Sequence, residues 1–443
     1  METQHGKFVA LITYACIVPI GSRGLILRFR GNSLLVSISS PTWASNDESV
    51  AVARMGAARK TDSGVAYPPK AATDRSDWID LIKATSVILV VQMHFVLSML
   101  EVTGSEVTGF WHAFITVLEP FRMPTFFLVS GMLAAGAINR GWGTSRKRTL
   151  GTMYLYVLWS LILAGTMLLT LPLTGLTMSP GTVLTGLLFP ADGYWYLLAL
   201  VVFFVVAKAA RNVPVWLVLG LAAVPNILRP ETQAFFENVI GPFHSPGMLH
   251  AIALNLVFFL IGAYHKQALL DLGRAARWPL VALLGGAGVL LSLIRFNNPD
   301  TWGNQFFLLC LLWIATGIMA ASLIARYEHP RRFAHYVGAR TLPIFVLQFP
   351  LIFLTKVWLA ESGSTVLDGW AAQALYPIVA PALVVAAALV LYRVAMASNL
   401  RFLFEAPQWA IAPGRSGQIR LPVRTPKPTT PEPTATLVPV ASA

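Results

Sequence analysis

Long apolar runs separated by short polar stretches fill the chain from Ile79 onward. About ten of them approach the length that a helix needs to cross a bilayer, which is roughly 20 residues. They lack the alternation of apolar and polar positions that is typical of strands, and an open sheet edge cannot face lipid. We therefore predict an all-α, polytopic membrane protein. The predicted spans are residues 79–100, 114–138, 150–171, 194–210, 214–229, 248–264, 278–295, 302–325, 341–360 and 375–397.

Lysine and arginine are concentrated in every second loop between these runs, whereas the intervening loops carry mostly Asp and Glu. Short cytoplasmic loops of membrane proteins have an excess of Lys and Arg. The alternation therefore predicts an even number of crossings in the cell (cytoplasmic) membrane, with both termini in the cytoplasm. The basic loops contain Lys70, Arg75, Arg140, Arg146, Lys147, Arg148, Lys208, Arg211, Lys266, Arg274, Arg277, Arg326, Arg331, Arg332 and Arg340.

The two ends of the chain are unlike this membrane region. Residues 1–54 form an uncertain leader. It can be read as holding a signal-peptide core, or translation can start at Met55, and we assign it no function. Residues 55–78 form a basic cytoplasmic leader, and residues 79–400 form the transmembrane domain. Residues 401–443 are rich in Pro and Thr, so we expect a disordered cytoplasmic tail.

The composition narrows the class of protein. Of the 443 residues, 56% are hydrophobic and 12% are charged, and the mean hydropathy is +0.64. Soluble domains carry roughly 25% charged residues, so a cytosolic globular enzyme is excluded. Two cysteines cannot build the framework of a secreted disulfide protein. The net charge of +13 comes largely from the loops, so it indicates membrane topology rather than binding to nucleic acid.

Three ionisable residues stand on one side of the first predicted span: Asp80, Lys83 and His94. At about 100° per residue they share one stripe of a helix. A rise of about 1.5 Å per residue places His94 roughly 16 Å deeper than Lys83. Two plainer interpretations exist: Asp80 and Lys83 form an interfacial pair, and His94 only bonds a neighbouring helix. However, a neutral imidazole at that depth can also accept and return a proton.

The second predicted span opens with a second unusual group of residues. Arg122 lies near its outer end or inside it, and we expect Pro124 to break or kink the helix. Ser130 and Gly131 are small residues that fit helix packing. A serine protease motif is a weak alternative, because Leu128 stands where its first glycine would be.

At these residues the sequence resembles the acyltransferase-3 family of multipass membrane O-acyltransferases. The first block of that family has an aspartate, a basic residue and a histidine eleven positions further, as Asp80, Lys83 and His94 have here. The second block is matched by Arg122, Met123, Pro124, Phe126, Phe127, Ser130 and Gly131. Less specific similarity is found at Arg146 to Arg148, at Trp195 to Leu197, and from Gly338 through Gln348.

Two positions depart from the family pattern. Lys83 stands where arginine is usual, so the positive charge is kept but the bidentate fork is lost. Gln348 stands where many members have histidine. Proton transfer assigned to that late position is therefore in doubt for this chain.

The resemblance implies transfer of an acyl group, often acetyl, from acyl-CoA to a hydroxyl of a glycan, a glycolipid or a related acceptor. The class is that of acyltransferases moving groups other than amino-acyl groups, with acyl-CoA as co-substrate and without a bound cofactor or metal. His94 would be the general base, and Asp80 would tune or orient the polar stripe. Donor binding would fall to Lys83, Arg122, Arg146, Lys147 and Arg148, with Arg122 able to hold either substrate. Pocket or packing positions would be Phe126, Phe127, Ser130, Gly131, Trp195 and Gln348.

Other functions remain open at this point. A lipid or glycan transporter would also contain buried charges and broken helices, although the two halves show no matching pair of Gly/Pro-interrupted segments. A non-catalytic membrane scaffold is a third possibility. Tyr194, Trp195 and Tyr196 form either an aromatic belt at the membrane interface or a platform for the acceptor.

Overall fold

The computed structural model divides the chain into two units, Met1–Ala72 and Thr73–Ala443, which we describe separately. Predictions for the rest of the leader, and for the tail beyond residue 411, lie outside the described residues. The described residues are 18–20, 24–29, 32–36, 77–103, 109–174, 193–240, 246–298, 305–361, 367 and 369–411.

The described part of the first unit is a small antiparallel sheet of three strands in the order β1-β2-β3. The strands are β1 (Val18–Ile20), β2 (Gly24–Phe29) and β3 (Asn32–Val36). Leu27 pairs with Leu34 in the longer of the two ladders. The sequence analysis assigned no secondary structure to this leader, because its apolar positions follow no clear period.

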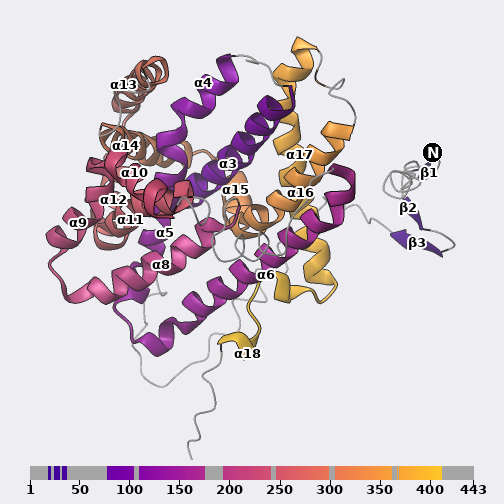
Figure 1. The fold of residues 1–443 in the computed structure, drawn as a ribbon, viewed down its shortest axis with the longest axis horizontal. Helices are drawn as coiled ribbons and strands as arrows, with labels where there is room; N and C mark the ends of the chain where they lie inside the picture. The colour runs from indigo at the N-terminus through magenta and orange to yellow at the C-terminus, as the bar shows by residue number, and fades with distance from the viewer. Residues whose placement is uncertain are drawn as a thin grey trace, which may run out of the picture. The chain divides into compact units, whose positions relative to one another are not determined.

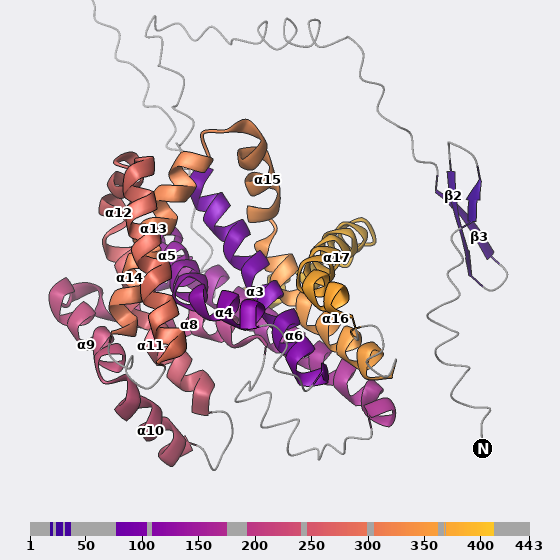
Figure 2. The same ribbon diagram turned by 90° about the horizontal axis from the view of Figure 1, so that it is seen from above.

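All regular elements in the described part of the second unit are helices (Figures 1 and 2). Nine stretches there are long and apolar enough to cross a membrane, in agreement with the predicted all-α, polytopic class. The main helices are α3 (Asp77–Thr103), α4 (Gly109–Val117), α5 (Glu119–Ile138), α6 (Trp142–Thr174), α8 (Trp195–Ala209), α9 (Val215–Ile227), α10 (Arg229–Ile240), α11 (Pro246–Tyr264), α12 (Lys266–Arg274), α13 (Trp278–Asn297), α14 (Phe306–Ile324), α15 (Glu328–Gly338), α16 (Thr341–Glu361) and α17 (Trp370–Ala397).

The fifth predicted span, residues 214–229, forms the short helix α9. Its 13 residues extend about 20 Å, less than the roughly 30 Å of a bilayer's hydrocarbon core. The backbone breaks at Leu228, with φ −107° and ψ 47°, and α10 follows. Both helices pack beside α11. The pair is long enough to cross together, so an even number of crossings stays a prediction.

The break in the second predicted span lies earlier than expected. α5 continues through Pro124, and the interruption falls at Leu118, between α4 and α5. Pro120 stands in the first turn of α5, where a missing N–H costs nothing. The expected break at Pro124 is therefore wrong, because the helix continues through that residue.

Helix α3 occupies the middle of the second unit (Figures 1 and 2). It contacts α5 and α14 on one side, α16 and α17 on the other, and α15 along its N-terminal half. Gly338, at the end of α15, lies so close that a Cβ atom there would come within 2.5 Å of the Asp80 carbonyl oxygen. The helix that carries the predicted polar stripe is thus enclosed by protein rather than by lipid.

Four helix ends that were predicted to lie outside the cell meet in one cluster. Arg295, in the last turn of α13, donates to a carboxylate oxygen of Glu119 at 2.9 Å, and Arg229 lies 3.9 Å from the other oxygen. Both guanidinium groups stack on the ring of Phe306, with Arg229 at 4.0 Å and Arg295 at 4.5 Å from its centre. The ends of α5, α10, α13 and α14 are therefore held on one side, as the loop charges predicted.

Buried Lys208 fixes the other end of α5. Its ammonium group donates to the carbonyl oxygens of Ala137, Ile138 and Arg140 and to the hydroxyl of Ser145. The last carbonyls of a helix have no partner inside the helix, so a cation placed there satisfies them. Lys208 therefore joins α8 to the C-terminal end of α5, and its role is structural.

The first residues of the predicted disordered tail are ordered. Residues 401–411 include a 3-10 turn (Arg401–Leu403) and the short helix α18 (Gln408–Ile411), which contacts α6. Trp159 donates its indole N–H to the carbonyl of Leu403 at 2.7 Å. The aromatic and apolar side chains of this segment pack against α6, and this burial explains why the segment is ordered.

Helices α5 and α11 form the most extensive helix pair in the second unit, and two glycines allow it. A Cβ atom on Gly131 would lie 1.9 Å from the carbonyl oxygen of Phe259, and one on Gly262 would lie 1.9 Å from that of Leu128. Small residues at a helix interface let the backbones approach closely. Gly131 is thus a packing residue.

We expect Gly131→Ala to destabilise the protein by about 1–3 kcal/mol, because the added methyl group must push α11 away. Thermal unfolding of the protein in detergent, followed by loss of the monodisperse peak, measures the effect. Gly136→Ala on the same helix is the matched control, since nothing lies within 4 Å of its Cβ position. Equal melting temperatures for the two variants would contradict this account of the interface.

Candidate functional site

His94 lies toward the C-terminal end of α3 and packs against one aromatic ring. Its imidazole meets Phe349 of α16 edge to face, with 5.1 Å between the ring centres. Phe349 in turn contacts Tyr194, whose hydroxyl donates to the carbonyl of Val346 at 2.7 Å. His94 is only partly buried although it stands in the middle of the bundle. Its ring therefore contacts an aromatic cluster that α8 and α16 form together.

Two cations from other helices act electrostatically on His94. They are Arg122 of α5 and Lys356 of α16. Arg122 is 6% exposed, and its guanidinium forms no hydrogen bond or ion pair with any described residue. A buried guanidinium in this state is costly in a membrane protein unless a ligand or water meets it. The second sequence block and the first therefore converge on one place.

Lys356 is a functional candidate that the sequence analysis missed. It lies inside the apolar run 341–360, so the rarity of lysine at such a depth was a usable signal. Phe349 and Lys356 are seven residues apart, which places them nearly on one face of α16 at about 100° per residue. That face is the one directed at His94.

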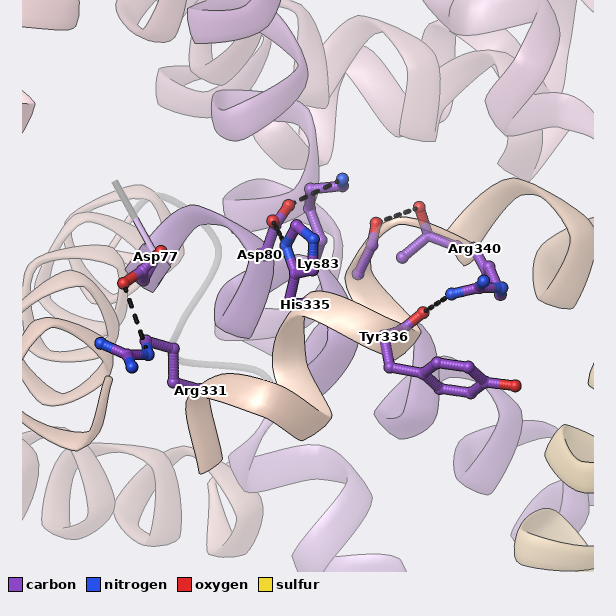
Figure 3. Close-up of polar contacts among 9 residues, drawn as sticks. Asp77, Asp80, Lys83, Arg331, His335, Tyr336 and Arg340 are labelled. Atoms are coloured by element: carbon purple, nitrogen blue, oxygen red, sulfur yellow. Dashed lines mark hydrogen bonds and ion pairs between the residues drawn. The ribbon is translucent and has the colours of Figure 1, made fainter. Parts of the chain in front are cut away.

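Asp80 and Lys83 form a separate cluster near the start of α3 (Figure 3). Asp80 is 2% exposed, accepts from Lys83 at 3.2 Å, and lies 3.1 Å from Nδ1 of His335 on α15. At about 1.5 Å per residue, Asp80 is roughly 21 Å from His94 along the helix. Asp80 therefore lies at the opposite end of the polar stripe from His94, and its role in tuning or orienting that stripe stays a prediction.

The basic run at the start of α6 is not a single anion site. Arg148 turns into the bundle, where it donates to the carbonyl of Leu133 at 3.2 Å and to that of Ser130 at 3.5 Å. Its guanidinium also lies 5.4 Å from the ring centre of Phe204. Arg146 is partly buried and Lys147 is exposed. Arg148 connects α6 to α5, and the predicted group of three donor-binding cations is divided.

The remaining residues of the second block pack together with the start of α8. Phe127 contacts Trp195 and Tyr196, at 5.7 and 4.9 Å between ring centres, and Phe126 stacks on Tyr196 at 4.7 Å. Ser130 shares a hydrogen bond of 2.7 Å with the Tyr196 hydroxyl. These contacts support the packing interpretation for Phe126, Phe127, Ser130 and Trp195.

The aromatic run at the start of α8 does not form a belt at the membrane interface. Tyr194 is 1% exposed and Tyr196 is 6% exposed. Their hydroxyl groups are turned to protein partners rather than to headgroups. Both tyrosines instead pack against aromatic rings of α16: Tyr194 contacts Phe349, and Tyr196 contacts Phe345.

Gln348 precedes Phe349 and is completely buried, yet neither amide atom has a hydrogen-bond partner among the described residues. An unsatisfied buried polar group costs about 1–3 kcal/mol, so it calls for an explanation such as water or a ligand. The hydroxyl groups of Ser86 on α3 and Thr125 on α5 are also buried without a hydrogen-bond partner among the described residues. An amide cannot transfer a proton as imidazole does, so Gln348 fits a binding role.

Comparison with known proteins agrees with this geometry. The acyltransferase-3 family, described as an acyltransferase domain, matches residues 76–393. The inner membrane protein YcfT of Escherichia coli is 24% identical over 370 residues, which cover 74% of this chain and 96% of that protein. No solved structure matches. Because the family match spans well over half of the chain and contains every helix that contributes to the His94 site, this protein belongs to the acyltransferase-3 family of membrane acyltransferases.

Proposed function

We propose that this protein is an O-acyltransferase that moves an acyl group from acyl-CoA to a hydroxyl of a cell-envelope glycan or glycolipid. The group belongs outside the amino-acyl class, and acetyl is the simplest case. One observation supports the proposal above all: the partly buried imidazole of His94 stands near the buried guanidinium of Arg122, which forms no hydrogen bond with any described residue. Both groups are expensive in a membrane interior, which makes a functional role the default explanation.

The proposed chemistry begins with His94 as general base. A ring nitrogen takes the proton of the acceptor hydroxyl while the hydroxyl oxygen attacks the thioester carbonyl. A carbon–oxygen bond forms, and the negative charge rests on the carbonyl oxygen. The carbon–sulfur bond then breaks, the imidazolium gives its proton to the departing thiolate, and coenzyme A leaves. Atoms and charges balance without any further reactant.

Arg122 and Lys356 would stabilise the oxyanion that forms during this step. Fixed positive groups in a site of low dielectric constant are most effective where charge develops in the transition state. Arg122 has its donors available because no described residue occupies them. Gln348 would bind a polar part of one substrate, since its buried amide has both a donor and an acceptor to offer.

The position of His94 along α3 assigns an entrance to each substrate. His94 is about 26 Å from Asp77 at the predicted cytoplasmic end of the helix, and about 14 Å from Thr103 at the predicted outer end. An acceptor of the cell envelope would therefore approach from the outer side. The thioester would come from the cytoplasmic side, along the face of α3 that begins at Asp80 and Lys83.

We expect His94→Ala to lower acylation of the acceptor to the level of cells that lack the protein, because no other base meets the hydroxyl. Mass spectrometry of envelope lipids and glycans reports both the acceptor and the acyl group. His112→Ala is the matched control, since His112 lies on α4 and its ring packs against Phe296. Acylation by membrane-inserted His94→Ala at the wild-type rate would remove the catalytic assignment.

Arg122→Gln should reduce kcat by about 10²–10³, the usual cost of losing one group that stabilises an oxyanion. Arg122→Lys should recover part of this loss, because it restores the charge but not the fork. Initial rates at saturating donor and acceptor measure the effect. If the glutamine variant kept wild-type kcat and only raised the KM of the acceptor, Arg122 would be a binding residue and not an oxyanion partner.

A further inference from the structure

A pocket of about 780 Å³ lies beside the N-terminal end of α3, far from His94. Most of its lining residues come from α15, with contributions from α3 and α17, and Figure 3 shows several of them. It lies on the predicted cytoplasmic side, and we call it the α15 pocket. It is lined by Asp77, Arg331, Arg332, His335, Tyr336, Ala339, Arg340 and Tyr392.

Positive charge dominates this lining: three guanidinium groups face one carboxylate. Arg331 is 3.9 Å from Asp77, and both side chains are about half exposed. Arg332 pairs with Glu328 in an exposed contact within one turn of α15. Exposed ion pairs of this kind contribute about 0–1 kcal/mol, so a phosphate group could replace either carboxylate at little cost. Arginine forks bind phosphate oxygens two at a time.

Two tyrosines add flat surfaces to the pocket. Tyr336 has the Arg340 guanidinium at 4.2 Å from its ring centre, and Arg340 also donates to the Tyr336 carbonyl at 2.9 Å. Tyr392 lines the opposite wall from α17 and meets Phe404 edge to face at 5.0 Å. Rings and guanidinium planes are surfaces on which a nucleobase stacks.

The α15 pocket is joined to the polar stripe of α3 by one residue. His335 lines the pocket and holds Asp80, which pairs with Lys83 (Figure 3). From Asp80 the stripe continues for about 21 Å to His94. A molecule with a phosphate-rich head in the pocket and a long thin arm of about that length would span the distance to the imidazole.

We propose that the α15 pocket binds the nucleotide end of acyl-CoA, with its phosphates on Arg331, Arg332 and Arg340 and its adenine against Tyr336 or Tyr392. This inference rests on the proposed function and adds the location of the donor. It replaces the basic run at the start of α6 as the donor's phosphate site. A lipid headgroup offers similar phosphate chemistry, but it does not need stacking surfaces.

Binding of coenzyme A to purified protein in nanodiscs of neutral lipid tests the proposal. Replacing Arg331, Arg332 or Arg340 by Gln should each raise the Kd about tenfold, the loss expected for one charge-assisted hydrogen bond. Donor KM should rise in parallel while kcat at saturating donor stays near wild type. Lys266→Gln, at an exposed basic residue of α12 on the same predicted side, is the matched control and should bind as wild type does.

His94→Ala separates this inference from the proposed function. It should bind coenzyme A normally and transfer nothing. If the wild type binds coenzyme A and all three α15 variants bind it equally well, the pocket assignment is wrong and the proposed function stands. If the wild type binds no coenzyme A, the donor of the proposed function is wrong as well. Variants that lose only the binding of added anionic lipid would identify the pocket as a headgroup site.

A second measurement needs no substitution, so it does not depend on variants that fold. Coenzyme A carrying a photoreactive azido group on its adenine should label peptides of α15 or the segment around Tyr392, and excess coenzyme A should prevent this. Labelling confined to the start of α6 would overturn the proposal.

Discussion

The cost of keeping an ionisable group away from water organises the membrane unit. Asp80 is buried but has Lys83 and His335, and Lys208 is buried but has four oxygen acceptors. Each of these charges holds helices together because its partners come from neighbouring segments. Arg122 differs, since its guanidinium forms no hydrogen bond or ion pair with a described residue, and Glu119, three residues earlier on α5, acts on it only through space. A substrate that carries or develops negative charge would give Arg122 the kind of partner that the other buried charges have within the protein.

Helix α3 extends from the α15 pocket to His94. Neighbouring helices pack against it along this length. Its start meets α15 at Gly338, and its far half meets α16 at Phe349. Close backbone packing limits how far such a helix can shift, so the distance between the α15 pocket and His94 is fixed by the helix itself. Under the proposed function, that fixed distance would suit only a donor with an arm of matching length.

Several parts of this arrangement could be read from the sequence. The spans follow from the length of apolar runs, and their ends on one side meet as the loop charges indicate, at Glu119, Arg229 and Arg295. His94 and Arg122 were found because charges inside apolar runs are rare. Helix α15 was read as a basic loop, since the face that it buries consists of the small residues Ala334, Val337 and Gly338. Such residues give a weak periodic signal in a charged segment.

The sequence by itself determined the class of the protein, the position of the membrane helices and the residues worth examining, because burial in lipid restricts local composition so strongly. Only the tertiary structure decided which charges share a site. Asp80 and His94 lie on one stripe but serve different ends of it, and Arg148 turns to backbone carbonyls instead of the donor. Lys356 reaches His94 from a helix more than 250 residues later in the chain. Contacts between residues so far apart in the sequence depend on how the helices pack. The local sequence around each residue does not indicate them.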